Sequence, residues 1–392
     1  MSDPITREEA FLKAIAEGSE PLEPITRREM FLAKMAGHNT ETPTPITREE
    51  MFLARAAENA GSGGGGSSEE WIGDGNTHIW ITLHEGRTSP MLGVCPNGTV
   101  TVDWGDGTTP DTLTGTSISS VKWTPKHEYS KAGNYVITLT VDGEMAIFGT
   151  NNKNEGSYIL RYNSATYEAN SAYLNAIKKV EIGNNVSIRD YALCYCQSLT
   201  SVAISDGITS IGKNAFQYCY SLVSVVMPNS LTSIGSSAFD QCYALATVAI
   251  PDSVTSIGTY LFNKCYSLSS VVIPSGITSI KDNTFYFCYS LVSVVIPHGI
   301  TNIGTYAFSG CYSLSSVVIP NSVTSISASA FASCRGIRYF DFTNHTAVPT
   351  LADTYAFYSL APDCEIRVPT ALYDEWIAAT NWSTSASKIV AV

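Results

Sequence analysis

The stretch LVSVVMPNSLTSIGSSAFDQCYA, residues 222–244, decides the fold because its pattern returns at a fixed step of 23 residues. Seven cysteines keep that step: Cys196, Cys219, Cys242, Cys265, Cys288, Cys311 and Cys334. Phenylalanines keep it too: Phe216, Phe239, Phe262, Phe285, Phe308 and Phe331. A fixed period of about 20–50 residues indicates a solenoid, in which each coil buries its apolar side chains against the neighbouring coils.

The parts of one coil can be assigned from the same stretch. Leu222, Val225 and Met227 have the LxxLxL spacing of a short strand with inward side chains. Pro228 ends the strand because proline cannot donate to a strand ladder. Phe239 and Cys242 lie three residues apart, which fits one short helical turn. Stacked coils of this kind place their strands side by side, so we expect a parallel sheet along one face.

The unit resembles the BspA-type leucine-rich repeat, over residues 177–345. That resemblance implies a binding module on a cell surface or outside the cell, without enzymatic activity. Residues 346–392 break the period, and LYDEWIAATNW within them looks like the C-terminal cap that a solenoid needs over its last open face.

The cysteine column allows two interpretations. Cysteine packs as a small hydrophobe, so a ladder at one coil position predicts buried, reduced thiols. Neighbouring ladder cysteines also lie near disulfide distance, which leaves oxidation open. The sequence contains no CxxC pair, and we expect no metal site among the cysteines.

Residues 76–148 alternate apolar, β-branched and aromatic residues and therefore predict strands. The segments VDWGDGT and HEYSKAGNYVITLTV resemble the PKD-type immunoglobulin-like β-sandwich, which implies a spacer or adhesive module of extracellular proteins. Asp103 and Asp106 are a weak calcium candidate, because calcium takes several oxygen ligands. The alternative is that both carboxylates hold a turn through backbone N–H groups. Residues 149–176 are expected to be a connector.

Residues 1–60 carry a second repeat, PITREEAFLKAIAE, PITRREMFLAKMAG and PITREEMFLARAAE. Each copy has threonine at the N-cap and glutamate three residues later, a capping box, so three short helices are expected. Their apolar residues form three groups: Phe11, Leu12 and Ile15; Phe31, Leu32 and Met35; Phe52 and Leu53. Such short helices need a partner, either one another in a mini-domain or a groove on another protein.

The helical repeats resemble N-terminal segments of structural proteins of gut phages. Residues 61–75 follow them as a Gly/Ser-rich flexible linker, native or engineered.

Charge and composition exclude several classes of function. The 392 residues carry a net charge of −12, which argues against nucleic acid because phosphate contacts need clustered Lys and Arg. No apolar run approaches the roughly 20 residues of a membrane span, and the N-terminus shows no signal peptide. No catalytic motif is found, and the one G-x-G-x-x-G match, residues 61–66, lies inside the glycine linker and follows no predicted strand, so no enzyme and no cofactor are expected.

A tyrosine follows each inner ladder cysteine and is the candidate binding surface: Tyr220, Tyr243, Tyr266, Tyr289 and Tyr312. Tyrosine combines apolar area with a polar tip, which suits an interface. Two interpretations stay open, a flat aromatic platform for a surface glycan or protein, and a column that only seals the edge of the solenoid.

The sequence therefore predicts a multidomain protein: short N-terminal helices, an all-β PKD/Ig-like sandwich, and a C-terminal leucine-rich-repeat solenoid. The main expectation is a non-enzymatic phage virion component, a tail fibre or receptor-binding protein, that is assembled in the cytoplasm and acts outside. Its helices would dock on a virion or surface-assembly protein, and its solenoid would contact a host-cell surface glycan or protein. The alternative is a BspA-like bacterial cell-surface adhesin. A homo-oligomer stays open.

Overall fold

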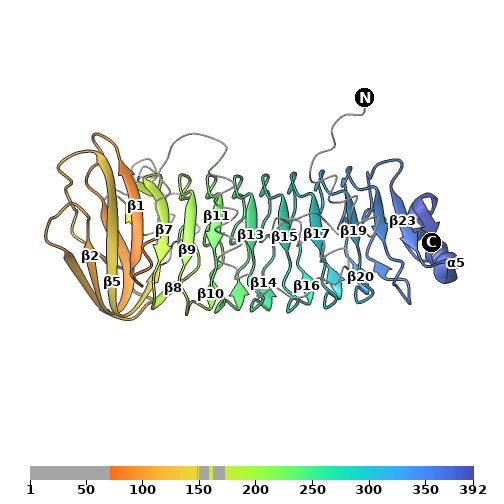
Figure 1. Ribbon diagram of the computed structural model, residues 1–392, viewed down its shortest axis with the longest axis horizontal. Coiled ribbons are helices and arrows are strands. Elements are labelled where there is room, and N and C mark those ends of the chain that lie inside the picture. The colour runs from red at the N-terminus through yellow and green to blue at the C-terminus, as the bar shows by residue number, and fades with distance from the viewer. Residues whose placement is uncertain (1–70, 148, 150–158, 162–172) are drawn as a thin grey trace, which may run out of the picture. The chain divides into compact units, whose positions relative to one another are not determined.

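The computed structural model describes residues 71–147, 149, 159–161 and 173–392. The predicted helices of residues 1–60, with the apolar groups that begin at Phe11, Phe31 and Phe52, lie outside the described residues, as do most of the linker and much of the connector. Trp71–Val392 is one compact unit, an elongated stack of coils with antiparallel strands at its N-terminal end (Figure 1).

The predicted solenoid is confirmed, but each coil supplies two short parallel strands and not the single strand expected. The expected helical turn around each phenylalanine is also not helical within residues 177–345, because flanking residues such as Ser237 and Gln241 have positive φ. One row consists of β9 (Ser201–Ile204), β11 (Ser224–Val226), β13 (Thr247–Ala249), β15 (Ser270–Val272), β17 (Ser293–Val295), β19 (Ser316–Val318), β21 (Tyr339–Asp341) and β23 (Glu365–Val368). The other consists of β10 (Ser210–Ile211), β12 (Ser233–Ile234), β14 (Ser256–Ile257), β16 (Ser279–Ile280), β18 (Asn302–Ile303), β20 (Ser325–Ile326) and β22 (Thr350–Leu351). Val271 pairs with Val248 and Val294, so the 23-residue step sets the register.

The interior of the stack is a ladder of aromatic rings. Each ladder phenylalanine is at most 1% exposed, and successive rings from Phe216 to Phe331 stack with centroids 5.2–5.8 Å apart. Since each ring packs between the rings of adjacent coils, every coil depends on its neighbours for burial.

The N-terminal strands are continuous with the coils. They are β1 (Thr77–Leu83), β2 (Met91–Asp103), β3 (Asp111–Thr116), β4 (Lys122–Trp123), β5 (Gly133–Ile147) and β6 (Leu160–Arg161). β1 and β5 are antiparallel neighbours; β1 also pairs with β7 (Ile177–Ile182), and β5 pairs in parallel with β8 (Val186–Ile188). Both rows of the solenoid therefore continue into this sheet, which covers strand edges that would otherwise be open.

One hydrophobic core runs through both parts and includes Ile79, Leu139, Val180 and Phe216. A separate PKD-type sandwich thus stays a prediction. The expected antiparallel strands are present, but they share their sheet and core with the repeats. The domain boundaries given by the sequence do not separate independent cores at this point.

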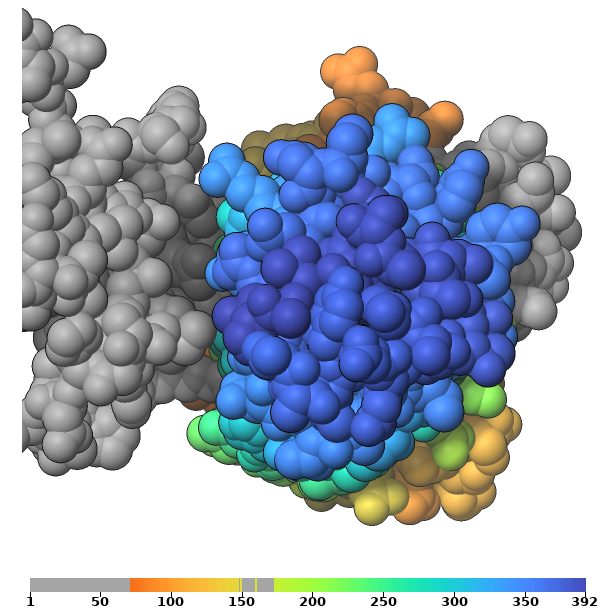
Figure 2. All heavy atoms as spheres, turned by 90° about the vertical axis from the view of Figure 1, so that its right-hand side faces the viewer, coloured from red at the N-terminus to blue at the C-terminus, as the bar shows by residue number. Residues whose placement is uncertain are grey.

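The C-terminal end is covered by η1 (Thr370–Leu372), α5 (Tyr373–Ala378), η2 (Trp382–Lys388) and β24 (Ile389–Ala391). Trp376 and Trp382 are 0% exposed, and both contact Phe342 edge-on at 4.9 and 5.6 Å. The Trp382 Nε1–H donates to the Pro349 carbonyl at 2.7 Å. Figure 2 looks onto this end, where the cap residues (dark blue) cover the centre of the last coil.

Candidate functional site

The five tyrosines of the predicted surface form one continuous stack, here called the tyrosine ladder: Tyr220, Tyr243, Tyr266, Tyr289 and Tyr312. Successive ring centroids lie 4.8, 4.8, 4.8 and 5.0 Å apart, with interplanar angles of 3°, 11°, 3° and 6°. The faces of the inner rings are therefore occupied by neighbouring rings. What the ladder presents to a partner is a row of ring edges and hydroxyl groups.

The ladder is held in place by the buried cysteines next to it. Each thiol donates to a backbone carbonyl of the preceding coil; Cys265 Sγ, for example, lies 3.2 Å from the Phe239 oxygen. The same bond recurs at Cys242, Cys288, Cys311 and Cys334, always to a ladder phenylalanine and at 3.0–3.2 Å. These thiols are free and buried, and burial raises the pKa of Cys265 well above its ordinary value. The column thus consists of neutral thiols that fix the turn from which each tyrosine projects.

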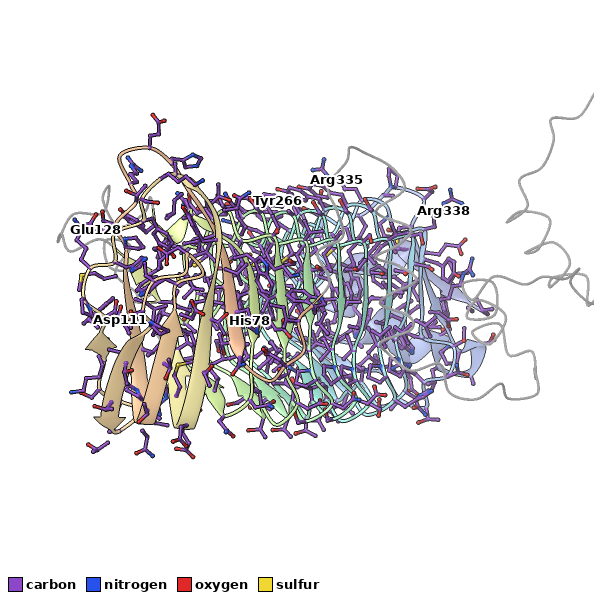
Figure 3. The ribbon with its side chains drawn as sticks, turned by 60° about the vertical axis from the view of Figure 1, so that its left-hand side comes forward. His78, Asp111, Glu128, Tyr266, Arg335 and Arg338 are labelled. Carbon is purple, nitrogen blue, oxygen red and sulfur yellow. The ribbon has the colours of Figure 1, made fainter. Side chains whose placement is uncertain are left out.

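The hydroxyl groups of the three inner tyrosines, Tyr243, Tyr266 and Tyr289, stay protonated at neutral pH. Burial, followed by the neighbouring phenols, raises the pKa of Tyr243, Tyr266 and Tyr289. Tyr243 donates its hydroxyl hydrogen to Gln241 Oε1 at 2.8 Å. Tyr266 and Arg335 lie along the same long edge of the array (Figure 3). Because a phenol both donates and accepts, the row offers hydrogen bonds of either sense to a partner.

Further aromatic side chains widen the ladder into an aromatic face. Phe287 lies 5.6 Å from Tyr289 and 4.0 Å from Tyr286, whose ring lies 5.7 Å from Tyr306 (centroid distances). Tyr306 is 42% exposed and Tyr312 43%. The resulting surface is a contiguous aromatic patch over the central coils, of the kind that marks interaction sites.

The backbone on both sides of each ladder phenylalanine adopts the left-handed conformation. The positions two before and two after it, such as Ser237 and Gln241, have φ near +60°. Tyr260, Tyr306 and Phe287 occupy the same positions with φ of 58°, 54° and 57°, although bulky residues rarely adopt this region. Their side chains are therefore directed by a strained turn that the stacked coils impose.

Glycine fits one of these positions for a second reason. Gly310 has φ +78°, and a Cβ there would lie 2.2 Å from Phe287 Cδ1. The absent side chain leaves the space in which the Phe287 ring lies, so the two residues act together to place an aromatic ring on the surface.

A polar ladder beside the phenylalanines was not indicated by the sequence. Gln217 Nε2 and Asn263 Nδ2 donate to the two carboxylate oxygens of Asp240, at 2.6 and 2.8 Å. Asp240 is 5% exposed, and burial raises its pKa. Only the equivalence of the three positions, 23 residues apart, could have suggested the contact. The two hydrogen bonds to Asp240 fix three adjacent coils relative to one another beneath the tyrosine ladder.

The residues behind the PKD resemblance converge on one cluster. The buried Trp104 ring stacks on His127 at 4.5 Å and 7°, and Tyr129 donates its hydroxyl hydrogen to the Trp104 carbonyl at 2.9 Å. Asp103 accepts the Gly105 N–H at 2.9 Å, and Asp106 contacts His127 Nε2 at 2.9 Å.

Asp106 also accepts the N–H and hydroxyl of Thr108, at 3.1 and 2.6 Å. Burial opposes ionisation, but the hydrogen bonds from Thr108 and His127 outweigh it and lower the pKa of Asp106. These contacts correspond to the turn-holding alternative, and a calcium role for Asp103 and Asp106 stays a prediction. Across the part of the chain that the structure describes, no group of three or more His, Cys, Asp or Glu side chains is placed to hold a metal ion.

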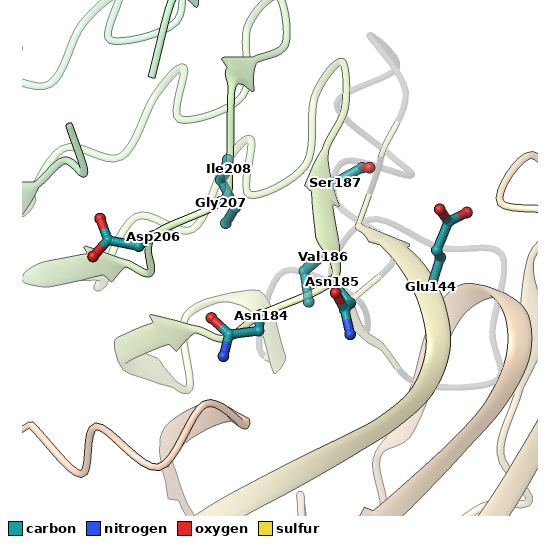
Figure 4. A pocket seen from close by; sticks show the side chains of 8 residues that line it. All are labelled: Glu144, Asn184, Asn185, Val186, Ser187, Asp206, Gly207 and Ile208. Atoms are coloured by element: carbon teal, nitrogen blue, oxygen red, sulfur yellow. The ribbon is translucent and has the colours of Figure 1, made fainter. Parts of the chain in front are cut away.

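The junction between the N-terminal sheet and the first coils contains an open polar groove of about 470 Å³. Its lining includes Glu144, Asn185, Ser187 and Asp206, and Figure 4 shows the two carboxylates on opposite sides. Acidic groups that do not converge form neither a metal site nor a catalytic pair.

None of the helices in the described residues has both the length and the apolar character that a membrane span requires.

A comparison with protein families gives one match. The family described as BspA type Leucine rich repeat region matches residues 186–315 and 233–364, with six copies. Residues 186–364 are a BspA-type repeat array. Arrays of this type are typically non-enzymatic binding modules, in keeping with an exposed face built from ladders. The comparison does not extend to the N-terminal strands or to the helical repeats.

Solved structures with related repeats are similar only in part. A leucine rich repeat protein of T. pallidum matches at 28% identity, over 35% of this chain and 72% of its own, with a TM-score of 0.33. A leucine-rich repeat protein from Bacteroides ovatus matches at 25%, over 49% and 60%, with a TM-score of 0.39. A leucine rich cell surface protein from Faecalibacterium prausnitzii matches at 25%, over 47% and 63%, with a TM-score of 0.29. The last two matches span less than two thirds of those chains, and no curated protein matches.

Proposed function

We propose that this protein is a non-enzymatic adhesion protein of the BspA-like cell-surface type, and that the tyrosine ladder with Tyr286, Phe287 and Tyr306 is its contact surface. The observation that carries the proposal is the aromatic face of the BspA-type array, where Tyr306 and Tyr312 are more than two-fifths exposed. Tryptophan, tyrosine and arginine are enriched among the residues that supply most of the binding energy at protein interfaces.

The ladder favours a protein surface over a glycan as its partner. A sugar ring packs its apolar face on an open aromatic face, but the inner rings of the ladder cover one another at 4.8 Å. Ring edges and hydroxyl groups are left, and they suit backbone and side-chain groups of a second protein. We therefore expect the contact to use hydroxyl hydrogen bonds and edge-on packing along the array.

Charge contributes little to this contact. Between Cys196 and Cys334 the sequence has three Lys, four Asp and neither Arg nor Glu. A nearly neutral surface gives weak electrostatic steering, so binding should depend little on salt.

The experiment compares labelled full-length protein and its variants for binding to a panel of bacterial and epithelial cells by flow cytometry. The variant Tyr243→Ser/Tyr266→Ser/Tyr289→Ser should lose binding at least tenfold. The matched control, Val272→Thr/Val295→Thr/Val318→Thr, changes three residues that are 51%, 42% and 53% exposed on the same or adjacent coils, and should bind normally. A folded tyrosine variant that binds as well as the control would remove the proposal.

The phage virion hypothesis is the second candidate and has less support. It rests on the helical repeats of residues 1–60, outside the described residues, and the family match favours the surface adhesin. Docking of those repeats on a larger assembly, a virion or extracellular location and a homo-oligomer remain predictions. Mass spectrometry of purified virions tests the hypothesis, since absence of the chain from particles would exclude it.

A further inference from the structure

The last coil of the array leaves two tyrosines uncovered. Phe357 continues the buried stack, 5.7 Å from Phe331, and Tyr355 and Tyr358 flank it with exposures of 56% and 60%. In inner coils the residue after the phenylalanine is less exposed: Asp240 and Asn263 are 5% and 7% exposed, and Tyr286 of the aromatic face is half-buried. The exposure of Tyr358 therefore follows from the end of the repeat.

These two tyrosines line a groove between the last turn and η2. The groove has a volume of about 290 Å³, close to the lower end of small-ligand pockets, roughly 300 Å³. Its lining includes Tyr355, Tyr358, Ser359, Thr384, Ser387 and Lys388. The two rings lie 5.6 Å apart at 70°, so they do not stack face to face as the rings of the tyrosine ladder do.

The polar groups of the groove are hydroxyls and one ammonium. Lys388 Nζ donates to the carbonyls of Ala361 and Pro362 at 2.7 and 3.0 Å, which fixes the side chain and leaves its third hydrogen free to donate. Thr384 donates its hydroxyl hydrogen to the Asn381 carbonyl at 2.7 Å, so its oxygen is left to accept. None of the lining residues is acidic.

We propose that this groove binds a neutral, hydroxyl-rich sugar residue at the end of a glycan chain. A hexose ring has an apolar face of C–H groups and a rim of hydroxyls. The tyrosine rings offer apolar area to the first, while Lys388 and the lining hydroxyls offer donors and acceptors to the second. A groove of this volume has room for about one sugar residue. This site is separate from the tyrosine ladder and does not depend on the function proposed for it.

The test is saturation-transfer NMR of the full-length protein with five free sugars: glucose, galactose, mannose, N-acetylglucosamine and N-acetylneuraminic acid. We expect transfer to the ring C–H protons of at least one neutral sugar, with a dissociation constant in the millimolar range that is usual for one small contact. Tyr355→Ser/Tyr358→Ser should weaken binding at least tenfold. Thr384→Val, which removes one acceptor, should weaken it by about fivefold or more.

Two controls separate this site from other causes. Tyr312→Ser removes a tyrosine that is 43% exposed but lies outside the groove, and it should bind the sugar normally. The ladder variant Tyr243→Ser/Tyr266→Ser/Tyr289→Ser should also bind the sugar normally, so the two proposals can fail independently. Absence of transfer to every sugar, or transfer that survives Tyr355→Ser/Tyr358→Ser in folded protein, overturns the site. Transfer to N-acetylneuraminic acid alone overturns the neutral ligand.

Discussion

Two substitutions in a single coil distinguish a ladder that stabilises the fold from a ladder that serves as a contact surface. Phe262 and Tyr266 belong to the same turn and both stack in continuous columns. Phe262→Ala and Tyr266→Ala each remove one ring from its stack. If the tyrosine ladder is an exposed contact surface, the two changes should differ clearly in their cost to the free energy of unfolding.

The structure sets the size of the difference. Phe262 is 0% exposed and lies 5.7 and 5.8 Å from the rings of Phe239 and Phe285, so its removal leaves a closed cavity. Such a change costs about 3–5 kcal/mol. Tyr266 is only half-buried, so water can fill the vacated space, and the loss is two stacked contacts of about 0.5–1.5 kcal/mol each. We expect a cost of about 1–3 kcal/mol for Tyr266→Ala, below that of Phe262→Ala.

The measurement is urea unfolding of both full-length variants, followed by far-ultraviolet circular dichroism. The shift in midpoint multiplied by the wild-type slope gives each change in stability. Because both residues lie in one coil, errors from incomplete two-state behaviour affect both values alike. Equal costs would refute the reasoning. They would show that the tyrosine column seals the edge of the solenoid, the alternative that the sequence leaves open.

Three further predictions concern buried groups. The ten cysteines are all buried and free, so native protein should not react with Ellman's reagent at pH 8, and unfolded protein should show ten thiols without a reductant; fewer than ten would indicate disulfides. Gly310→Ala should lower the free energy of unfolding, measured with urea, by about 1–3 kcal/mol, because φ is +78° and the new Cβ would clash with the Phe287 ring. If the loss is equally large in a Phe287→Ala background, the clash with Phe287 does not contribute to it. Burial among Phe342 and Trp376 lowers the pKa of His345. The unfolded state then takes up the proton first, so stability should fall as the pH drops below about 6.5, and His345→Phe should reduce that fall. An unchanged pH profile in His345→Phe would exclude this group as the cause.

The period was enough to predict the solenoid, for a physical reason. A side chain that recurs every 23 residues must meet its own copies when coils stack, so Phe262 and Cys265 could be assigned to interior columns without coordinates. The same argument correctly placed Tyr266 in a surface column. It could not give the orientation of the ring, which decides whether a face or an edge meets a partner.

The N-terminal part shows the limit of local pattern. The alternation in β1 and β5 predicted strands, but β1 pairs with β7, about a hundred residues away along the chain, and β5 with β8. Glu181 illustrates the consequence, since its carboxylate accepts the N–H groups of Ile72 and Gly73 at 3.0 and 2.8 Å. No short-range signal encodes such pairing, so a sequence that resembles two modules folds here around one core.

By itself the sequence determined the coil, its interior ladders and the near-neutral tyrosine surface, because a repeat specifies contacts between equivalent positions. Tertiary structure alone decided what happens where the repetition stops. The first coils share a sheet with β1 and β5, and the last turn has no following coil to cover Tyr358. Exposure at an end depends on which non-repeated segment packs there, and the path of η2 past Tyr355 cannot be read from a period.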